Sequence, residues 1–327
     1  MNTPPSQSPQ TNAAADVGST DTAPNTTNGL TPVSEIIDLP RGSDLTEANA
    51  MALAKSRPVR WVVIAGPVGA GKTTLLTSIY ELFQWGKIPN YIFAGSGTLP
   101  AFEQRCHLSR VESESEEEDT PRTLYDDQGP KYLHLRVAAA KTPSMHIDFL
   151  FTDVSGEMFE HVRDSTDACK DLAFLRRAGN FILLLDSKKA LRPDKRWATI
   201  EEAKTILRSC LDSQMLAGDC VVTVLWSKFD YFVESGDSTE DQAFRRQVVK
   251  EFNELFGARV LHLNFGEVAA RPTKARKLGF GQGTVELLDG WITLCPSARA
   301  MDLLPEVSGT RESEIFAARH FEEHQQL

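Results

Sequence analysis

The chain has 327 residues, of which 41% are hydrophobic, and it carries a formal net charge of −10 at pH 7. That length allows one large domain or two small ones, and the acidic balance argues against nucleic-acid or anionic-membrane partners, because both are polyanions. No bilayer-spanning run, secretory signal or lipidation motif is found, so we expect a cytoplasmic protein.

The N-terminal segment, residues 1–57, contains no aromatic residue, and as far as Gly29 it is mostly Thr, Asn, Ser, Pro, Ala and Asp. Such a segment buries too little apolar surface to offset its ordering entropy, so we expect a disordered tail over 1–57. Within that tail, 45–55 has the pattern of a short helix. A structured domain over 58–297 and a partly helical tail over 298–327 are expected to follow.

The structured part begins with an apolar strand over 60–65, a glycine-rich turn and a helix over 75–83. The turn has the spacing Gly-x-x-x-x-Gly-Lys-Thr of a phosphate-binding P-loop. Its glycines allow the backbone N–H groups and the helix dipole to surround a phosphate. Lys72 is expected to reach the β- and γ-phosphates, and Thr73 to bind Mg²⁺. The nucleotide contacts predicted in this loop are Gly66, Pro67, Val68, Gly69, Ala70, Gly71, Lys72, Thr73 and Thr74.

The remaining segments alternate between apolar strands and amphipathic helices, after a segment at 91–94 that fits either a strand or irregular structure. An acidic run at 112–119 interrupts the pattern and predicts a solvated insertion near 111–128. The alternation predicts a doubly wound α/β sheet, mostly parallel, with one antiparallel edge pair. The expected strands are 132–138, 146–152, 181–185, 221–226 and 260–265, and the expected helices are 99–111, 159–177, 197–215, 241–256 and 283–294.

Two polar motifs follow strands whose carboxyl ends should face the same crevice as the P-loop. Asp153-Val154-Ser155-Gly156 follows the strand 146–152. Asp153 is expected to hold Mg²⁺ through water, and Gly156 to offer its N–H to a γ-phosphate. The alternative is an ordinary strand-ending turn in which Asp153 caps the next helix.

The second motif, Ser227-Lys228-Phe229-Asp230, follows the strand 221–226. The Asp230 carboxylate can accept hydrogen bonds from both N1–H and the exocyclic amine of guanine, whereas adenine offers no such pair of donors. Lys228 is expected to lay its stem over the base, and Ser227 to brace the loop. The alternative is a polar turn that leaves a strand.

Together these motifs resemble the Ras-like G domains of translation-factor-related P-loop GTPases, over residues 60–295. The phrase Asp-Val-Ser-Gly-Glu and the long insertion are most similar to bacterial double-GTPase proteins. The resemblance implies a three-layer Ras-like P-loop NTPase fold that binds GTP or GDP with Mg²⁺ and hydrolyses GTP slowly. It also implies signalling to a protein partner, such as a second GTPase.

The chain departs from that family at three places. Ser227 stands where Asn or Thr is usual, which we expect to weaken guanine recognition slightly. Glu157 stands where many relatives have a water-orienting Gln or His, so we expect slow or partner-dependent hydrolysis with Glu157 as a catalytic candidate beside Lys72. The switch threonine that would bind Mg²⁺ is Thr120 or Thr123, and we favour Thr123. The competing hypotheses are a P-loop ATPase or kinase and a scaffold that binds nucleotide without hydrolysis.

Overall fold

The computed structural model describes residues 44–112, 129–164, 166–272 and 277–293, and all of them belong to one unit, Leu39–Leu327. Residues 1–43 of the tail predicted over 1–57, residues 113–128 of the predicted acidic insertion and the predicted C-terminal tail over 298–327 lie outside these residues. Within the described ranges, no helix is long and apolar enough to cross a bilayer.

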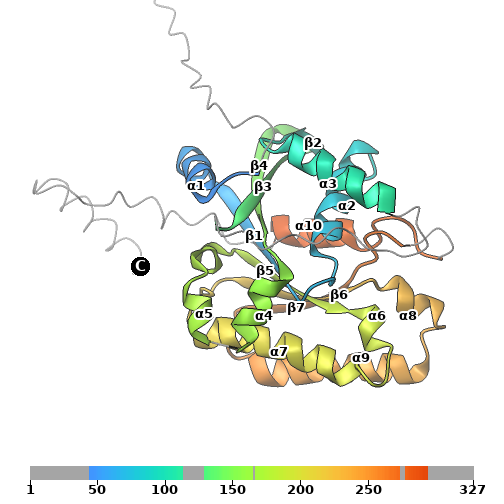
Figure 1. Ribbon diagram of the computed structural model, residues 1–327. Coiled ribbons are helices and arrows are strands. Elements are labelled where there is room, and N and C mark those ends of the chain that lie inside the picture. The colour runs from blue at the N-terminus through green and yellow to red at the C-terminus, as the bar shows by residue number, and fades with distance from the viewer. Residues whose placement is uncertain (1–43, 113–128, 165, 273–276, 294–327) are drawn as a thin grey trace, which may run out of the picture. The chain divides into compact units, whose positions relative to one another are not determined.

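The strands form one seven-stranded sheet in the order β2-β3-β4-β1-β5-β6-β7 (Figure 1). β1 runs parallel to both of its neighbours, β4 and β5, and the parallel pairing continues through β6 to β7. β3 runs antiparallel to both β2 and β4. This is the mostly parallel sheet with an antiparallel edge that the sequence predicted. The strands are β1 (Val59–Ala65), β2 (Tyr91–Gly95), β3 (Lys131–Ala139), β4 (Thr142–Asp153), β5 (Asn180–Asp186), β6 (Val221–Ser227) and β7 (His262–Glu267).

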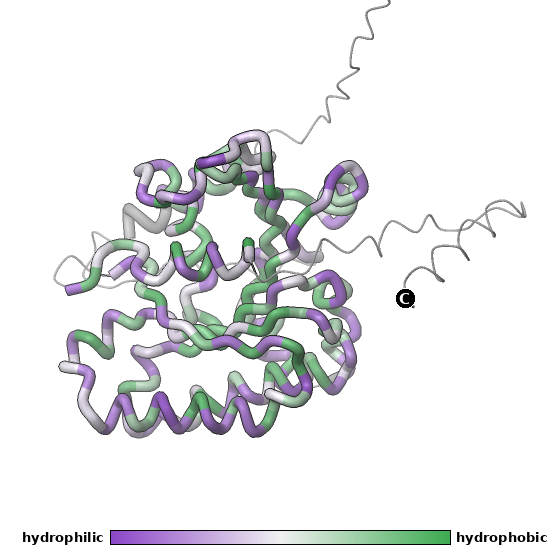
Figure 2. The backbone as a smooth tube through the Cα atoms, turned by 180° about the vertical axis from the view of Figure 1, so that it is seen from behind, coloured by the Kyte–Doolittle hydropathy of each residue, from purple (hydrophilic) through white to green (hydrophobic). Residues whose placement is uncertain are grey.

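Helices cover both faces of the sheet because its strands are apolar on both sides (Figures 1 and 2). Along β1, Trp61 and Val63 enter one apolar cluster, and Val62 and Ile64 enter the other. The first cluster contains the helices α1, α4, α5, α7 and α9, and the second contains α2, α3 and α10. The helices are α1 (Glu47–Ser56), α2 (Lys72–Gln84), α3 (Leu99–Glu112), α4 (Gly156–Asp164), α5 (Thr166–Lys170), the 3₁₀ helix η1 (Ala173–Arg177), α6 (Ser187–Ala190), α7 (Arg196–Asp212), α8 (Asp230–Glu234), α9 (Thr239–Phe256) and α10 (Thr284–Thr293).

The segment 44–57 belongs to this fold, although the sequence predicted a disordered tail as far as residue 57. Leu45 is fully buried and exchanges two backbone hydrogen bonds with Tyr132 of β3, at 2.9 and 3.0 Å. Thr46 then caps α1, its side chain accepting from the Asn49 N–H. The predicted helix is therefore present, and packing against the sheet stabilises a segment whose composition alone favours disorder.

The single helix predicted over 159–177 is wrong, because the chain forms α4, α5 and η1 there. Leu172, Leu175 and Ala178 each donate a backbone hydrogen bond to the residue three positions earlier, which tightens the chain into 3₁₀ geometry. These turns bury Leu175 and Ala178 before the chain enters β5. The apolar spacing of the sequence fits a regular helix equally well, so only the packing distinguishes the two.

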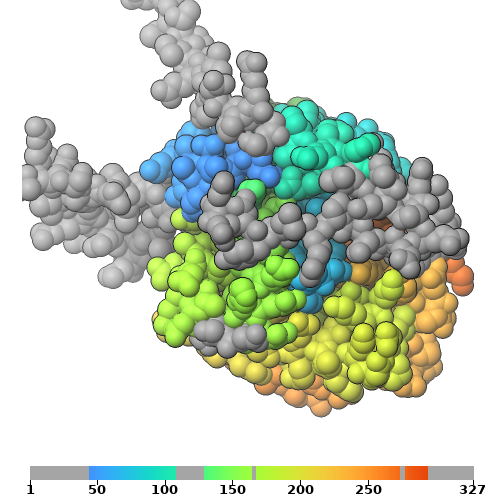
Figure 3. All heavy atoms as spheres, viewed as in Figure 1, coloured from blue at the N-terminus to red at the C-terminus, as the bar shows by residue number. Residues whose placement is uncertain are grey.

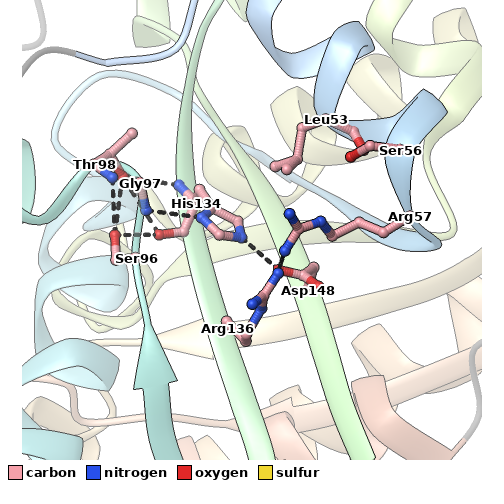
Figure 4. Close-up of polar contacts among 9 residues, drawn as sticks. All are labelled: Leu53, Ser56, Arg57, Ser96, Gly97, Thr98, His134, Arg136 and Asp148. Carbon is pink, nitrogen blue, oxygen red and sulfur yellow. Dashed lines mark hydrogen bonds and ion pairs between the residues drawn. The ribbon is translucent and has the colours of Figure 1, made fainter. Parts of the chain in front are cut away.

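A charged cluster ties the antiparallel edge of the sheet to the loop before α3 (Figure 4). Asp148 of β4 is 5% exposed, and its Oδ1 lies 2.7 Å from His134 Nε2 and 2.8 Å from Arg136 Nε. The Gly97 N–H donates to His134 Nδ1 at 2.8 Å, so that nitrogen is the acceptor and Nε2–H donates to Asp148. The ring thus joins β4, β3 and the loop as a neutral imidazole.

Replacing Asp148 with Asn should lower the free energy of unfolding by about 3 kcal/mol, because it leaves two donors without their buried anion. Burial raises the pKa of Asp148, but hydrogen bonds from His134 and Arg136 outweigh it, so the net pKa lies below the ordinary 3.8. The carboxylate therefore stabilises the fold above pH 3.8 and loses this effect as the pH falls through its folded pKa. Urea unfolding at pH 7 and pH 3 measures both effects.

The matched control for this measurement is Asp194→Asn, which removes a carboxylate from an exposed pair with Arg192. This control should leave stability unchanged, since exposed ion pairs contribute little. Equal unfolding free energies for the two variants would show that Asp148 carries no special structural role.

Candidate functional site

The P-loop follows β1 and leads directly into α2. Gly69 and Gly71 have φ angles of +75° and +93°, a region closed to most side chains, and a Cβ at either would meet nothing within 4 Å. Gly71 is also the N-cap of α2, and no side chain caps this helix. A left-handed, open loop at the positive end of a helix dipole fits the binding of an anionic phosphate.

Lys72, the first residue of α2, folds back over the loop. Its Nζ donates to the carbonyl oxygens of Gly66 and Pro67, at 3.0 and 3.1 Å. Burial lowers the pKa of Lys72 to about 8, although Asp153 and Glu160 act in the opposite direction. The ammonium is therefore held over the P-loop in surroundings that favour a further anionic partner.

Asp153 is the last residue of β4 and lies close to the P-loop. Thr152 of β4 pairs with Val63 of β1. Asp153 is the next residue of β4, so it lies beside the point on β1 that is two residues before the P-loop begins. Asp153 is 6% exposed and influences the pKa of Lys72. The structure also gives Asp153 a partner that sequence reasoning missed: Arg105 of α3 donates to its Oδ2 through Nε and Nη2, at 2.9 and 2.6 Å.

Gly156 begins α4 and lies directly against the P-loop backbone. A Cβ on this residue would lie 2.4 Å from Val68 N, 2.6 Å from Val68 Cα and 2.8 Å from Pro67 C. Distances this short exclude any side chain, so glycine is required here by steric contact. The Asp-x-x-Gly motif and the P-loop, predicted separately from the sequence, thus meet at this point.

The third motif lies at the carboxyl end of β6, beside the end of β5. Ser227 is buried and its hydroxyl donates to the Leu185 carbonyl at 3.2 Å. Lys228 has a φ of +53°, which is uncommon for a residue with a side chain and is typical of constrained functional loops. Its Nζ lies 3.1 Å from Oδ2 of Asp186, the last residue of β5. The ammonium is thus held by Asp186 at the same edge of the sheet.

Asp230 begins α8 and is 4% exposed. The residue before it, Phe229, donates its N–H to the Val268 carbonyl at 3.0 Å, which joins the loop after β6 to the loop after β7. The guanidinium of Arg245 lies over the Phe229 ring at 5.1 Å from its centroid, and it also pairs with Asp237 at 2.6 Å. These contacts attach the motif to the loop after β7 and to α9, which carries Arg245.

Other predicted residues lie at the margins of this site. Glu157 is in the first turn of α4, next to Gly156. Thr120 and Thr123, the switch candidates, lie outside the described residues. In the described ranges, no group of three or more His, Cys, Asp or Glu side chains could hold a metal. Thr73 and Asp153 still fit Mg²⁺, which takes hard oxygen ligands and usually relies on one or two carboxylates plus phosphates.

Arg105 and Asp186 are two charged residues of this site that the sequence did not identify. Asp186 could have been found, because it stands at the carboxyl end of a buried strand, as Asp153 does. Arg105 gives no such signal, since it lies in a helix 48 positions from its partner.

Comparison with known proteins gives one finding for this region. The sequence model of a family described as Double-GTPase 2 matches residues 60–292, which include all three motifs. The match confirms the resemblance to double-GTPase proteins that the motifs suggested. No curated protein matches the chain.

Stability should depend on pH through Lys72. Its folded pKa of about 8 lies below the ordinary 10.5, so between these values the unfolded chain binds more protons and unfolding free energy rises with pH. We expect Lys72→Met to remove about 2 kcal/mol of this rise, measured by urea unfolding of the unliganded chain at pH 8 and 10. Lys87→Met, which alters a lysine beside Trp85, should retain the rise; equal curves for both variants would contradict the burial of Lys72.

Substitution of Gly156 by Ala should push the P-loop away from α4. We expect a loss of about 1–3 kcal/mol in unfolding free energy and at least a roughly tenfold loss in nucleotide affinity, because the new Cβ meets backbone that cannot rotate away. Gly218→Ala is the matched control, since a Cβ there meets nothing within 4 Å. Thermal unfolding measures the loss of stability, and titration with a fluorescent GDP measures the loss of affinity. A Gly156→Ala variant with the same GDP affinity as the control would refute the contact.

Proposed function

The chain belongs to the Double-GTPase 2 family, and on that premise we propose that it is a molecular switch that binds GTP and GDP with Mg²⁺ and slowly hydrolyses GTP. Family membership implies guanine-nucleotide binding. The observation that carries the proposal is the contact between Gly156 and the P-loop, because it lets the Asp-x-x-Gly segment respond to the γ-phosphate.

The proposed nucleotide site uses the three motifs in separate roles. The P-loop amides and Lys72 hold the phosphates, and Asp230 accepts hydrogen bonds from guanine. Thr73 and Asp153 would hold the Mg²⁺, which would supply charge neutralisation at the phosphate oxygens. In support, Ser227 is hydrogen-bonded to β5 and Phe229 to the loop after β7, so contacts within the protein hold the base-reading loop in place.

Hydrolysis in this proposal depends mainly on positioning and charge stabilisation. Glu157, next to Gly156, would orient the attacking water, but its negative charge opposes the γ-phosphate. We therefore expect slow turnover that a protein partner, such as a second GTPase, accelerates. Loss of the γ-phosphate would release the segments 112–124 and 153–164.

The decisive experiment is a comparison of affinities for GDP, GTPγS and an ATP analogue, with and without Mg²⁺. Asp230→Asn should weaken guanine-nucleotide binding by roughly a hundredfold, because two hydrogen bonds to a charged group are lost, and it should favour xanthine nucleotides. Comparable affinity for ATP and GTP would favour a P-loop ATPase instead. Selectivity that Asp230→Asn leaves unchanged would show that another residue reads the base.

Turnover separates a switch that hydrolyses GTP from a scaffold that only binds it. We expect phosphate release by the wild type to exceed that of Lys72→Ala, because Lys72 contacts the transferred phosphate. Equal rates would support the scaffold.

A further inference from the structure

Arg105 lies between two carboxylates that come from distant parts of the chain. Its Nε and Nη2 donate to Asp153 Oδ2, and Nη2 is also 2.8 Å from Asp44 Oδ1. The side chains of Arg105, Asp153 and Asp44 are 17%, 2% and 18% exposed. Both ion pairs are therefore largely shielded from water, where charge interactions are strongest.

The three residues stand on elements that the fold holds in place. Arg105 is on α3, and its Nη1 also donates to the Ala101 carbonyl at 3.1 Å, which restrains the guanidinium. Asp44 precedes Leu45, whose backbone is bonded to Tyr132 of β3. Figure 3 shows the surface of α1, in blue, directly beside the teal surface that includes α3. Asp44 is thus a second carboxylate held beside the guanidinium, at ion-pair distance.

Asp153 has more cationic neighbours than one carboxylate needs. Arg105 pairs with Asp153 directly, and Asp153 also raises the pKa of Lys72. Both hydrogen bonds from Arg105 go to Oδ2 of Asp153, so a divalent cation that uses Asp153 must either share the carboxylate with the guanidinium or displace it. The guanidinium can yield Asp153 without becoming an unpaired buried charge, because Asp44 is already within reach.

We propose that Arg105 is a positioning residue that competes with Mg²⁺ for Asp153, and that Asp44 holds the guanidinium when the metal is bound. This inference rests on the proposed Mg²⁺-dependent binding of guanine nucleotide. In this proposal Arg105 changes its partner from Asp153 of β4 to Asp44. The segment before α1 therefore takes part in the response to nucleotide.

The two partners of Arg105 should affect Mg²⁺ in opposite directions. Arg105→Gln removes the competing cation, so the Mg²⁺ concentration for half-maximal GDP binding should fall by roughly tenfold, as expected for a charge in direct contact with a carboxylate. Asp44→Asn makes Asp153 the one carboxylate paired with the guanidinium, so the Mg²⁺ concentration for half-maximal GDP binding should rise by roughly threefold. Arg105→Lys keeps the charge and should behave more like the wild type.

The experiment is a Mg²⁺ titration of fluorescent GDP binding, repeated as Mn²⁺ binding to the GDP complex followed by electron paramagnetic resonance. The matched control is Arg136→Gln, which removes an arginine of β3 paired with Asp148 of β4, the strand that also carries Asp153, and which should leave the Mg²⁺ dependence unchanged. Unfolding curves for every variant identify losses that come from instability.

The outcomes distinguish this inference from the proposed function. Opposite shifts in Arg105→Gln and Asp44→Asn support competition, whereas a purely structural role would weaken binding in both. Shifts of the same sign, or none, overturn the inference while guanine binding stands. The inference is also overturned if GDP binding by the wild type does not depend on Mg²⁺. A chain that binds no guanine nucleotide would overturn both the inference and the proposed function.

Discussion

The close approach of Gly156 to Val68 is the constraint on which the candidate site depends. Because no side chain fits between them, the end of β4, the start of α4 and the loop after β1 are held at backbone contact. Arg163 of α4 in turn pairs with Glu202 of α7 at 3.0 Å. Contacts therefore run from the P-loop to α4 and from α4 to α7, which packs on one face of the sheet.

The second constraint is the pairing of buried charge at the carboxyl ends of the strands. Asp153 pairs with Arg105, and Asp186 pairs with Lys228. Burying an unpaired carboxylate costs several kcal/mol, so each partner stabilises the loop that bears it. Both pairs stand at the carboxyl ends of strands, the edge of the sheet at which the P-loop follows β1.

Much of the fold could be predicted because its strands and helices carry strong local patterns. The buried strand β5 and the amphipathic helix α9 were found within two residues at each end. The strand expected at 260–265 instead forms at His262–Glu267, because pairing with β6 sets its register and leaves Leu261 65% exposed. The helix expected at 159–177 failed for a similar reason, since burial of Leu175 and Ala178 requires 3₁₀ turns.

The sequence by itself determined the three motifs, their order and their positions at strand ends, because glycine spacing and apolar periodicity are local properties of the chain. Only the tertiary structure decided that Gly156 touches Val68, that Asp186 holds Lys228, and that Arg105 bridges Asp153 and Asp44. These contacts join residues far apart in the sequence, and no local pattern encodes which distant charges will meet. The sheet order brings them together, and the cost of leaving a buried charge unpaired selects the partners.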